Sequence, residues 1–379
     1  MIYFDNAATG GRKPDCVLTA VSSAVKVCAN PGRSGHKLSL ACAKQVQNCR
    51  HALNTHFDGY GFDRVAFTKN CTEALNIALF GVLKKGDHVV TTCMEHNSVL
   101  RPLEYLRQMG IIEYDVCPLR GEVSEASLHA EDILALLRPN TRLVAVTAAS
   151  NVTGYIPDLN AVRSILPENV LFLCDAAQGA GHFDIKMQGA GIDLLAIAGH
   201  KGMLGIQGSG ALLFSEKVNP SPLLFGGTGS ISLSLDMPDF YPDCLEAGTL
   251  AFPAILSLLE GTRHLALRQN IISKKIRSLT EYLLQGLKAL SNYTVYSKPN
   301  PCGIVAFAHR DIPSETVAEY LSEKYAVAVR GGLHCAPLMH KALNTHDGGL
   351  VRVSFSNDNT YREVDRLISA LATLQSAEY

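Results

Sequence analysis

Short, mostly apolar segments alternate with longer segments of helical periodicity through the first two hundred residues of this chain. The apolar segments have the length of strands and end in turn residues; they are 65–68, 88–92, 143–147, 170–174 and 194–198. Apolar strands separated by helices are typical of a parallel sheet that is covered on both faces. We therefore predict an α/β fold with a mostly parallel sheet flanked by helices, and we expect ligands at the carboxyl ends of its strands.

Beyond residue 250 the pattern changes. Residues 251–290 form one long helical segment, which we expect to be broken or bent near Gly261 and Asn270. Four short strand-like segments follow, at 293–296, 303–307, 326–329 and 351–355. Thr360 and Glu363 have the spacing of a capping box and open a final helix. This part of the chain predicts a smaller α+β unit.

The change of pattern divides the chain into two domains. We predict a large domain at residues 15–260 and a small domain formed by residues 1–14 and 261–379, with the long helical segment as the hinge. Of the 379 residues, 47% are hydrophobic, which is enough to bury a core in each domain.

The charge and cysteine content exclude several classes of protein. Lys and Arg number 34 against 35 Asp and Glu, so we expect no nucleic-acid partner and no basic membrane anchor. The apolar runs are far shorter than the roughly 18–20 residues of a membrane span, and no signal peptide is recognisable. Eleven cysteines without a Cys-x-x-Cys pair indicate free thiols in a reducing compartment. We therefore expect a soluble, cytoplasmic protein.

Two polar residues stand where the predicted strands end. Lys201 lies in a glycine-bracketed turn after strand 194–198, and Asp175 ends strand 170–174. Taken singly, each has an ordinary explanation, as a solvated surface lysine or as a helix N-cap. Together they match the needs of pyridoxal phosphate, which requires a lysine for its aldehyde and an acid beside its ring nitrogen.

Three further segments could complete such a site. Asn70-Cys71-Thr72-Glu73 opens a helix, so its free amides could hold a phosphate, although it is equally an ordinary capped helix start. The glycine-rich segment 226–230 could also bring amides to a phosphate, but a flexible loop explains it as well. His96 opens another helix, where an imidazole could stack on a flat cofactor or serve a purely structural role.

Eight short motifs in a fixed order carry a family resemblance. They are YFDNAAT at 3–9, TEALN at 72–76, EHNS at 95–98, SNVTG at 150–154, DAAQ at 175–178, GHK at 199–201, EAGT at 246–249 and RGGLHCA at 330–336. Over essentially its whole length the chain resembles the cysteine desulfurases and selenocysteine lyases of the class V aminotransferase superfamily. The resemblance implies a fold-type I pyridoxal-phosphate transferase with a sheet of the seven-stranded type, and a homodimer.

The resemblance also implies a role for individual residues. Lys201 would form the Schiff base with the cofactor, and His96 would stack on the cofactor ring and move protons. Asp175 would pair with the ring nitrogen, Gln178 would hydrogen-bond the phenolic oxygen, and Asn151 would touch the substrate or the ring oxygen. Thr72 and His200 would hold the phosphate, and Thr228 would reach the phosphate of the neighbouring subunit. Cys71, at a cofactor-binding position, and Ala198 stand where the family usually has a hydroxyl residue. The loss of hydroxyl donors predicts weaker cofactor binding.

Cys335 is the candidate nucleophile. The resemblance implies that its thiolate takes sulfur from the substrate as a persulfide, while the other ten cysteines are expected to be structural. A metal site built from His334, Cys335, His340 and His346 is an alternative, but the spacing fits no closed tetrahedral pattern, and we predict no metal.

Two arginines are candidates for binding the substrate carboxylate. Arg352 resembles the family arginine that grips it as a bidentate fork, although a strand arginine is often only exposed. Arg330 is a secondary candidate for the same pocket.

The predicted reaction converts L-cysteine to L-alanine and leaves sulfur on Cys335 as a persulfide. Selenocysteine lysis, cysteine-sulfinate desulfination and another class V aminotransferase reaction are alternatives on the same scaffold. From other classes, a non-catalytic cofactor-binding scaffold or a thiol-rich metal protein remain open. The short stretch after Cys335 indicates a compact catalytic loop, and by resemblance this favours a sulfur-acceptor or activating protein as partner.

Overall fold

The computed structural model describes residues 1–27 and 29–374, and over these residues the largest sheet has seven strands. They are β2 (Val65–Thr68), β3 (Asp87–Thr92), β4 (Ile112–Cys117), β5 (Thr141–Thr147), β6 (Leu171–Asp175), β7 (Leu194–Ala198) and β8 (Gly210–Phe214), in the spatial order β2-β8-β7-β6-β5-β3-β4. Only β8 runs against its neighbours, and the other pairings are parallel. The predicted mostly parallel sheet is confirmed.

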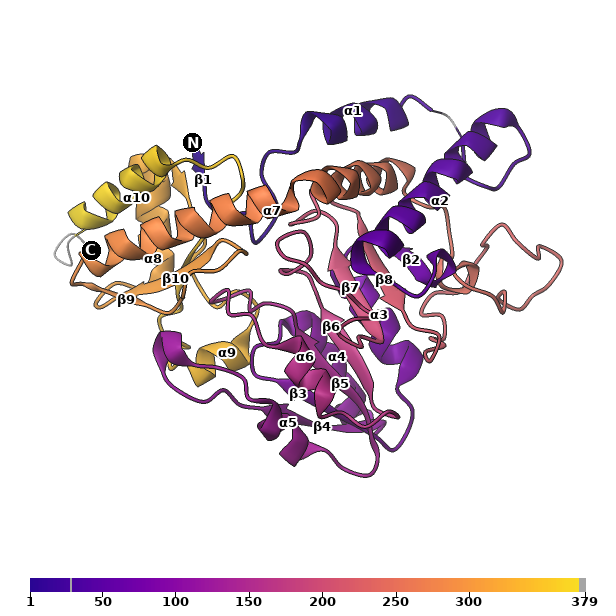
Figure 1. Ribbon diagram of the computed structural model, residues 1–379, viewed down its shortest axis with the longest axis horizontal. Helices are drawn as coiled ribbons and strands as arrows, with labels where there is room; N and C mark the ends of the chain where they lie inside the picture. The colour runs from indigo at the N-terminus through magenta and orange to yellow at the C-terminus, as the bar shows by residue number, and fades with distance from the viewer. Residues whose placement is uncertain (28, 375–379) are drawn as a thin grey trace.

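Both faces of this sheet are covered by helices (Figure 1). Side chains alternate along each strand, so that Leu171 and Leu173 belong to one buried cluster and Phe172 and Cys174 to the other. The first cluster packs against α3 (Cys71–Val82) and α4 (Asn97–Gln108). The second packs against α2 (Lys37–Phe57), α6 (Leu159–Ser164) and α7 (Phe252–Lys288). Burial on both faces explains why the strands are apolar throughout.

The C-terminal part of the chain forms a smaller unit that also includes the N-terminus (Figure 1). Within the described residues, β9 (Tyr293–Val295), β10 (Ile304–His309) and β12 (Val351–Ser354) form an antiparallel sheet, and β1 (Ile2–Tyr3) pairs in parallel with β11 (Val327–Ala328). The helices of this unit are α8 (Ser314–Tyr325), α9 (Pro337–Ala342) and α10 (Tyr361–Thr373). The capping box of Thr360 and Glu363 is formed. The exact domain boundaries proposed above stay a prediction.

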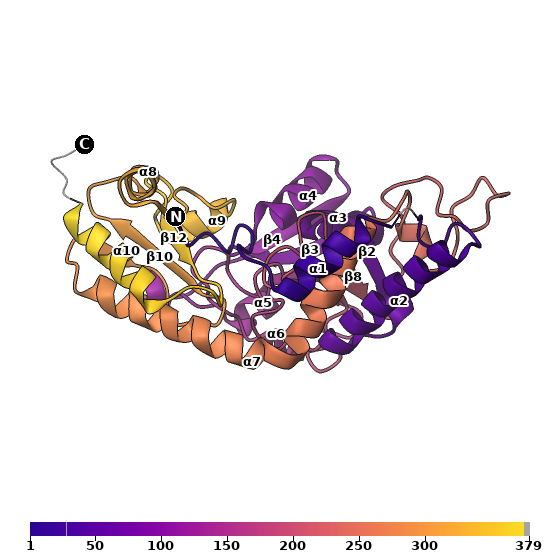
Figure 2. The same ribbon diagram turned by 90° about the horizontal axis from the view of Figure 1, so that it is seen from above.

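The helix α7 is continuous over 37 residues, so of the expected break or bend near Gly261 and Asn270 the break does not occur. It runs along both units, and Figure 2 shows that it curves on its way. Gly261 lies where α7 crosses the segment after Lys201, and a Cβ there would collide with the carbonyl oxygen of Met203. This glycine therefore permits a close approach rather than ending the helix.

The remaining elements are short. They are the helices α1 (Asp15–Ala24) and α5 (Ala130–Leu136) and the 3₁₀ turns Phe62–Arg64, Val123–Glu125 and Asp243–Leu245. Among residues 1–27 and 29–374, no helix has the length and apolar character needed to cross a membrane.

Candidate active site

A cavity lies at the carboxyl edge of the large sheet. Because β2, β3, β5, β6 and β7 point the same way, the segments that follow them meet at this edge. The lining residues are Asn70, Cys71, Thr72, Leu75, His96, Ser98, Thr147, Asn151, Asp175, Ala177, Gln178, Ala198, His200 and Lys201. The structure thus brings together eight of the residues singled out in the sequence: Lys201, Asp175, His96, Thr72, Cys71, Gln178, His200 and Asn151.

Lys201 follows β7 and is fixed through the residue before it. The carbonyl oxygen of His200 accepts hydrogen bonds from the Gly10 amide and from Nζ of Lys13, both at 2.9 Å. Burial lowers the pKa of Lys201, and the negative charge of Asp175 only partly opposes this. A lysine in such surroundings loses its proton readily and can then attack a carbonyl carbon.

Asp175, at the end of β6, presents one engaged oxygen and one open oxygen. Its Oδ1 accepts the amide hydrogen of Ala177 at 2.9 Å and the thiol hydrogen of Cys71 at 3.4 Å. Its Oδ2 accepts no hydrogen bond from the described residues, and the side chain lines the cavity. The carboxylate can therefore receive one further donor from the cavity side.

The N-terminus of α3 faces the same cavity. Oδ1 of Asn70 accepts the amide hydrogen of Glu73 at 2.9 Å, which caps the helix as the sequence predicts. The amides of Cys71 and Thr72 belong to the first helical turn, whose N–H groups have no acceptor inside the helix. Such amides and the positive end of the helix dipole favour a bound anion.

A chain of hydrogen bonds connects Thr72 to His96. The Thr72 hydroxyl lies 2.8 Å from Oγ of Ser98, which lies 2.9 Å from Nδ1 of His96. Burial lowers the pKa of His96 to about 4, so its ring is neutral near pH 7. Ser98 received no role in the sequence analysis, although it lies in the EHNS motif; its burial at the cavity wall is the signal that singles it out.

The N-terminal segment closes one side of the cavity. Nε2 of Gln178 donates a hydrogen bond to the Ala7 carbonyl at 2.9 Å, and Nδ1 of His200 lies 3.1 Å from Oγ1 of Thr9. Burial lowers the pKa of His200 to about 4. The residues just after β1, which the sequence assigns to the small domain, therefore contact two residues of the large one.

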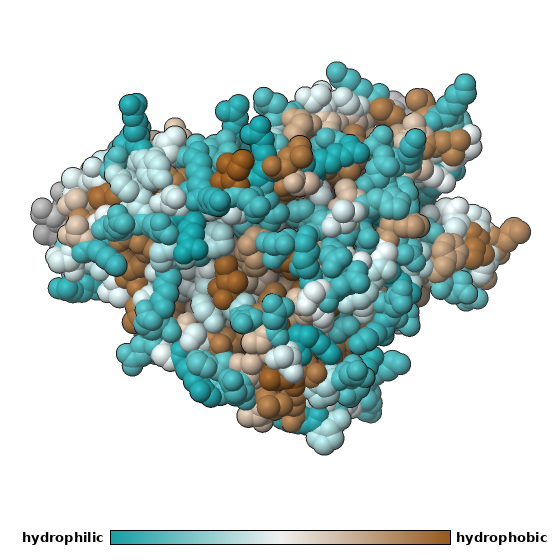
Figure 3. Space-filling model, viewed as in Figure 1, coloured by the Kyte–Doolittle hydropathy of each residue, from teal (hydrophilic) through white to brown (hydrophobic). Residues whose placement is uncertain are grey.

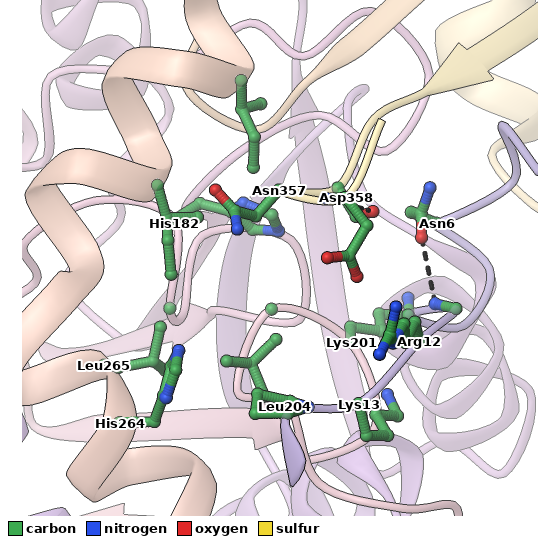
Figure 4. A pocket seen from close by; sticks show the side chains of 18 of the residues that line it. Asn6, Arg12, Lys13, His182, Lys201, Leu204, His264, Leu265, Asn357 and Asp358 are labelled. Carbon is green, nitrogen blue, oxygen red and sulfur yellow. Dashed lines mark hydrogen bonds between the residues drawn. The ribbon is translucent and has the colours of Figure 1, made fainter. Parts of the chain in front are cut away.

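Lys201 also borders a second, larger cavity of about 410 Å³. Figure 4 shows Arg12, Lys13 and Lys201 gathered on one side of this cavity, with His264 of α7 on another. Burial lowers the pKa of Lys13 to about 8. The second cavity contains neither His96 nor Asp175 among its lining residues, so the acid, the imidazole and Lys201 converge only in the first.

Cys335 lies outside the first cavity, on a loop fastened to its rim. Its carbonyl oxygen accepts the Asn97 amide hydrogen at 2.8 Å, and the carbonyl oxygen of His334 accepts a hydrogen bond from Nδ2 of Asn151 at 2.7 Å. His334 and Cys335 have φ angles of 50° and 58°, a left-handed conformation that is uncommon outside glycine. The Cys335 thiol is exposed and lies 3.9 Å from Nη2 of Arg330. The backbone of Cys335 is thus held beside the residue that follows His96, while its thiol lies near Arg330.

Arg352 is buried between the two units, not exposed on its strand. Its Nη2 pairs with Oδ1 of Asp5 at 2.9 Å, and its Nη1 donates to the Asn151 carbonyl at 2.9 Å. Its Nε is buried without a hydrogen-bond partner in the structure. Arg352 therefore contacts Asn151, which lines the cavity, and its Nε–H group donates no hydrogen bond to the described residues.

Arg330, Arg352 and Thr228, like Cys335, are not among the residues that line this cavity. Thr228 hydrogen-bonds Ser230 in a projecting segment, residues 223–240. Among residues 1–27 and 29–374, the structure assembles no group of three or more His, Cys, Asp or Glu side chains able to hold a metal.

A mostly parallel sheet with a half-buried lysine after one strand and a carboxylate at the end of the neighbouring strand defines the class of fold-type I transferases. Comparison with known proteins gives the family. Residues 2–367 match the model of the family described as aminotransferase class-V, and the chain belongs to that family.

Individual relatives are named more specifically. A probable cysteine desulfurase of Methanothermobacter thermautotrophicus is 32% identical over 97% of this chain and 92% of its own. The apo structure of a cysteine desulfurase from Thermococcus onnurineus superimposes with a TM-score of 0.88 at 29% identity, covering 98% of this chain and 94% of that one. An Escherichia coli cysteine desulfurase in an S-sulfonic acid form gives 0.86 at 26% identity, covering 97% and 93%.

Proposed function

We propose that this chain is a pyridoxal-phosphate-dependent cysteine desulfurase that converts L-cysteine and the Cys335 thiol into L-alanine and a Cys335 persulfide. The observation that carries the proposal is the position of the Cys335 loop, whose carbonyl groups are bonded to Asn97 and Asn151 at the rim of the cavity that contains Lys201. Relatives over nearly the whole length bear the name of this activity.

The residues of the cavity fit pyridoxal phosphate. A half-buried lysine of lowered pKa suits the aldehyde, the open Oδ2 of Asp175 suits a protonated ring nitrogen, and the first turn of α3 suits the phosphate. When bound, this cofactor supplies an electron-withdrawing ring that stabilises negative charge on the substrate carbons. Thr72 and His200 would hold the phosphate, and Gln178 would reach the phenolic oxygen.

The neutral His96 would accept and return protons at the face of the cofactor. Its Nδ1 accepts the Ser98 amide hydrogen, which fixes the ring as the N-cap of α4. Arg352 and Asn151 would hold the substrate carboxylate, because Asn151 lines the cavity and Arg352 contacts it directly. Arg330 would lie beside the reacting thiol, because the guanidinium of Arg330 is close to the sulfur of Cys335.

The thiolate of Cys335 would attack the sulfur of the bound substrate. The S–S bond forms as the Cβ–S bond breaks, the released electron pair stays on the substrate carbon skeleton, and protonation there gives alanine. A reductant then releases the outer sulfur of the persulfide as sulfide, or a thiolate of a sulfur-accepting protein takes that sulfur as its own persulfide, and either step restores the Cys335 thiol.

The test is the production of alanine and sulfide from L-cysteine with excess dithiothreitol. We expect equal amounts from the wild-type chain and near-total loss in Cys335→Ala. Cys16 is also exposed, so Cys16→Ala is the matched control and should keep full activity. Activity that survives in Cys335→Ala would exclude Cys335 as the sulfur acceptor.

The same assay with selenocysteine and cysteine sulfinate separates the alternatives. Release of selenium or sulfite that is indifferent to Cys335→Ala, without turnover of L-cysteine, would identify a selenocysteine lyase or a desulfinase instead. Full turnover with reductant alone would argue against a required activating protein.

We also propose a homodimer in which the projecting segment contacts the second copy. This segment stands away from the sheet (Figure 1), and Leu233 and Leu235 are fully exposed on it, with Phe225 77% exposed. Figure 3 shows apolar side chains on the same projection. Exposed apolar side chains of this kind are typical of an interface. Sedimentation should give a dimer for the wild-type chain and monomers for a Leu233→Asp/Leu235→Asp variant. The cytoplasmic location stays a prediction.

A further inference from the structure

Cys71 is the first residue of α3, and its side chain turns toward the end of β6. Its Sγ lies 3.4 Å from Oδ1 of Asp175, and both residues line the cavity that contains Lys201. The sequence places Cys71 where a phosphate contact is expected, yet its hydrogen bond in the structure goes to the carboxylate.

This contact decides which oxygen of Asp175 remains open. Oδ1 is bound by two donors, the thiol of Cys71 and the amide of Ala177, which lie on different elements. Two donors on one oxygen fix the rotation of the carboxylate about its Cβ–Cγ bond. Oδ2, which accepts nothing from the described residues, is left for a donor inside the cavity.

The contact also keeps the sulfur in its thiol form. Burial and the charge of Asp175 both raise the pKa of Cys71, and the charge of Lys201 only partly offsets this. Only the protonated thiol can donate the hydrogen bond, and the thiol is a poor nucleophile compared with the thiolate. A second sulfur therefore lies in the cavity without competing with Cys335.

We propose that Cys71 is a positioning residue, whose thiol donates to Oδ1 of Asp175 and thereby directs Oδ2 toward the ring nitrogen of the cofactor. The proposal rests on the proposed function, because it assigns a use to Oδ2 that only pyridoxal phosphate requires. It also predicts that a hydroxyl, which is a stronger donor than a thiol, can take the place of Cys71.

The first experiment measures the dissociation constant and the absorption spectrum of the full-length chain with pyridoxal phosphate. Cys71→Ala should weaken binding about tenfold, at the low end for a bond to a charged group because a thiol is a weak donor, and should shift the pH midpoint of the cofactor absorption. Cys71→Ser should restore both values to within about threefold of the wild-type chain.

Cys174 supplies the matched control. It is equally buried and adjoins Asp175, but it has no hydrogen bond to that carboxylate in the structure. Cys174→Ala should leave the absorption midpoint unchanged. A Cys71→Ala variant that matches the wild-type chain, or a Cys71→Ser variant that behaves like Cys71→Ala, overturns the proposal.

A second experiment tests the hydrogen bond between Cys71 and Asp175 in the absence of the cofactor. A failure of this proposal can therefore be told apart from a failure of the proposed function. In the full-length chain free of pyridoxal phosphate, the rate of Cys71 alkylation by iodoacetamide is measured by peptide mass relative to that of Cys16, an exposed thiol whose neighbour is His264 rather than Asp175. Asp175→Asn should raise this relative rate at least about fivefold, because loss of a neighbouring negative charge favours the thiolate. An unchanged rate shows that the thiol does not donate to Asp175 and overturns the proposal.

Discussion

Asp5 and Arg352, 347 positions apart in the chain, form an ion pair of 2.9 Å between the start of the chain and its last strand. The arginine is almost completely buried, with 1% of its side chain exposed, and the aspartate is partly exposed at 23%. The pair joins the turn after β1 to β12 and thereby holds the N-terminal segment over the cavity. Arg352 also reaches Asn151, so one guanidinium connects the two units of the fold.

Loss of the Asp5 carboxylate should leave a buried cation with one partner fewer. We expect Asp5→Ala to lower the free energy of unfolding by about 1–3 kcal/mol, and Asp5→Asn, which keeps an acceptor, to lower it less. Urea denaturation measures both. Asp347→Ala serves as control, because that aspartate is 97% exposed and should contribute no measurable stability.

The side chain of Asn151 should help to hold the loop that contains His334 and Cys335 in place. Asn151→Ala removes the 2.7 Å hydrogen bond to the His334 carbonyl, so the strained conformation of His334 and Cys335 loses one of its supports. Hydrogen exchange of the peptide that covers residues 330–340 should become faster. If exchange there matches the wild-type chain, the loop is held by other contacts.

The buried ion pair between Arg50 and Glu246 holds the residues that follow the projecting segment against α2. Glu246 accepts hydrogen bonds from both terminal nitrogens of Arg50, at 2.8 and 2.6 Å, and from the Phe67 amide at 2.7 Å. Glu246→Ala should cost about 3–5 kcal/mol in the free energy of unfolding, because it leaves a buried charge unpaired. Glu104→Ala breaks an exposed pair with Arg107 and should cost far less. Equal losses in the two variants would contradict this assignment.

The pH dependence of stability should carry a signature of Glu95. Burial raises the pKa of Glu95 to about 8, and its Oε2 has no hydrogen-bond partner among residues 1–27 and 29–374. Between pH 4.5 and 8 the folded chain holds a proton on Glu95 that the unfolded chain releases. The contribution of the protonated Glu95 to the free energy of unfolding is therefore full below pH 4.5 and is lost as the pH rises toward 8. Relative to the wild-type chain, Glu95→Gln should therefore gain stability as the pH rises. The measurement is urea denaturation of both proteins across that range, and a constant difference would show that Glu95 is ionised when folded.

The sequence by itself determined five of the seven strands of the large sheet, but not β4 or β8, and it determined the edge at which to look for chemistry. Lys201 and Asp175 could be paired in advance because parallel strands bring their carboxyl ends to one edge, whatever the details of packing. The sequence also placed His96 at this edge, because His96 stands at the start of a helix that comes after another strand of the same sheet. Local capping was equally readable, since Thr360 and Glu363 act within a single turn.

Only the tertiary structure decided which atoms meet across these elements. Gly261 and Asn270 suggested a break or a bend in α7, but the helix is continuous, and the close crossing over Met203 requires Gly261 there. The hydrogen bond from Cys71 to Asp175 and the ion pair of Asp5 with Arg352 join residues 104 and 347 positions apart. Periodicity and capping report on neighbours along the chain, whereas the partner of a buried polar group is set by whichever donor or acceptor the packed fold brings within reach.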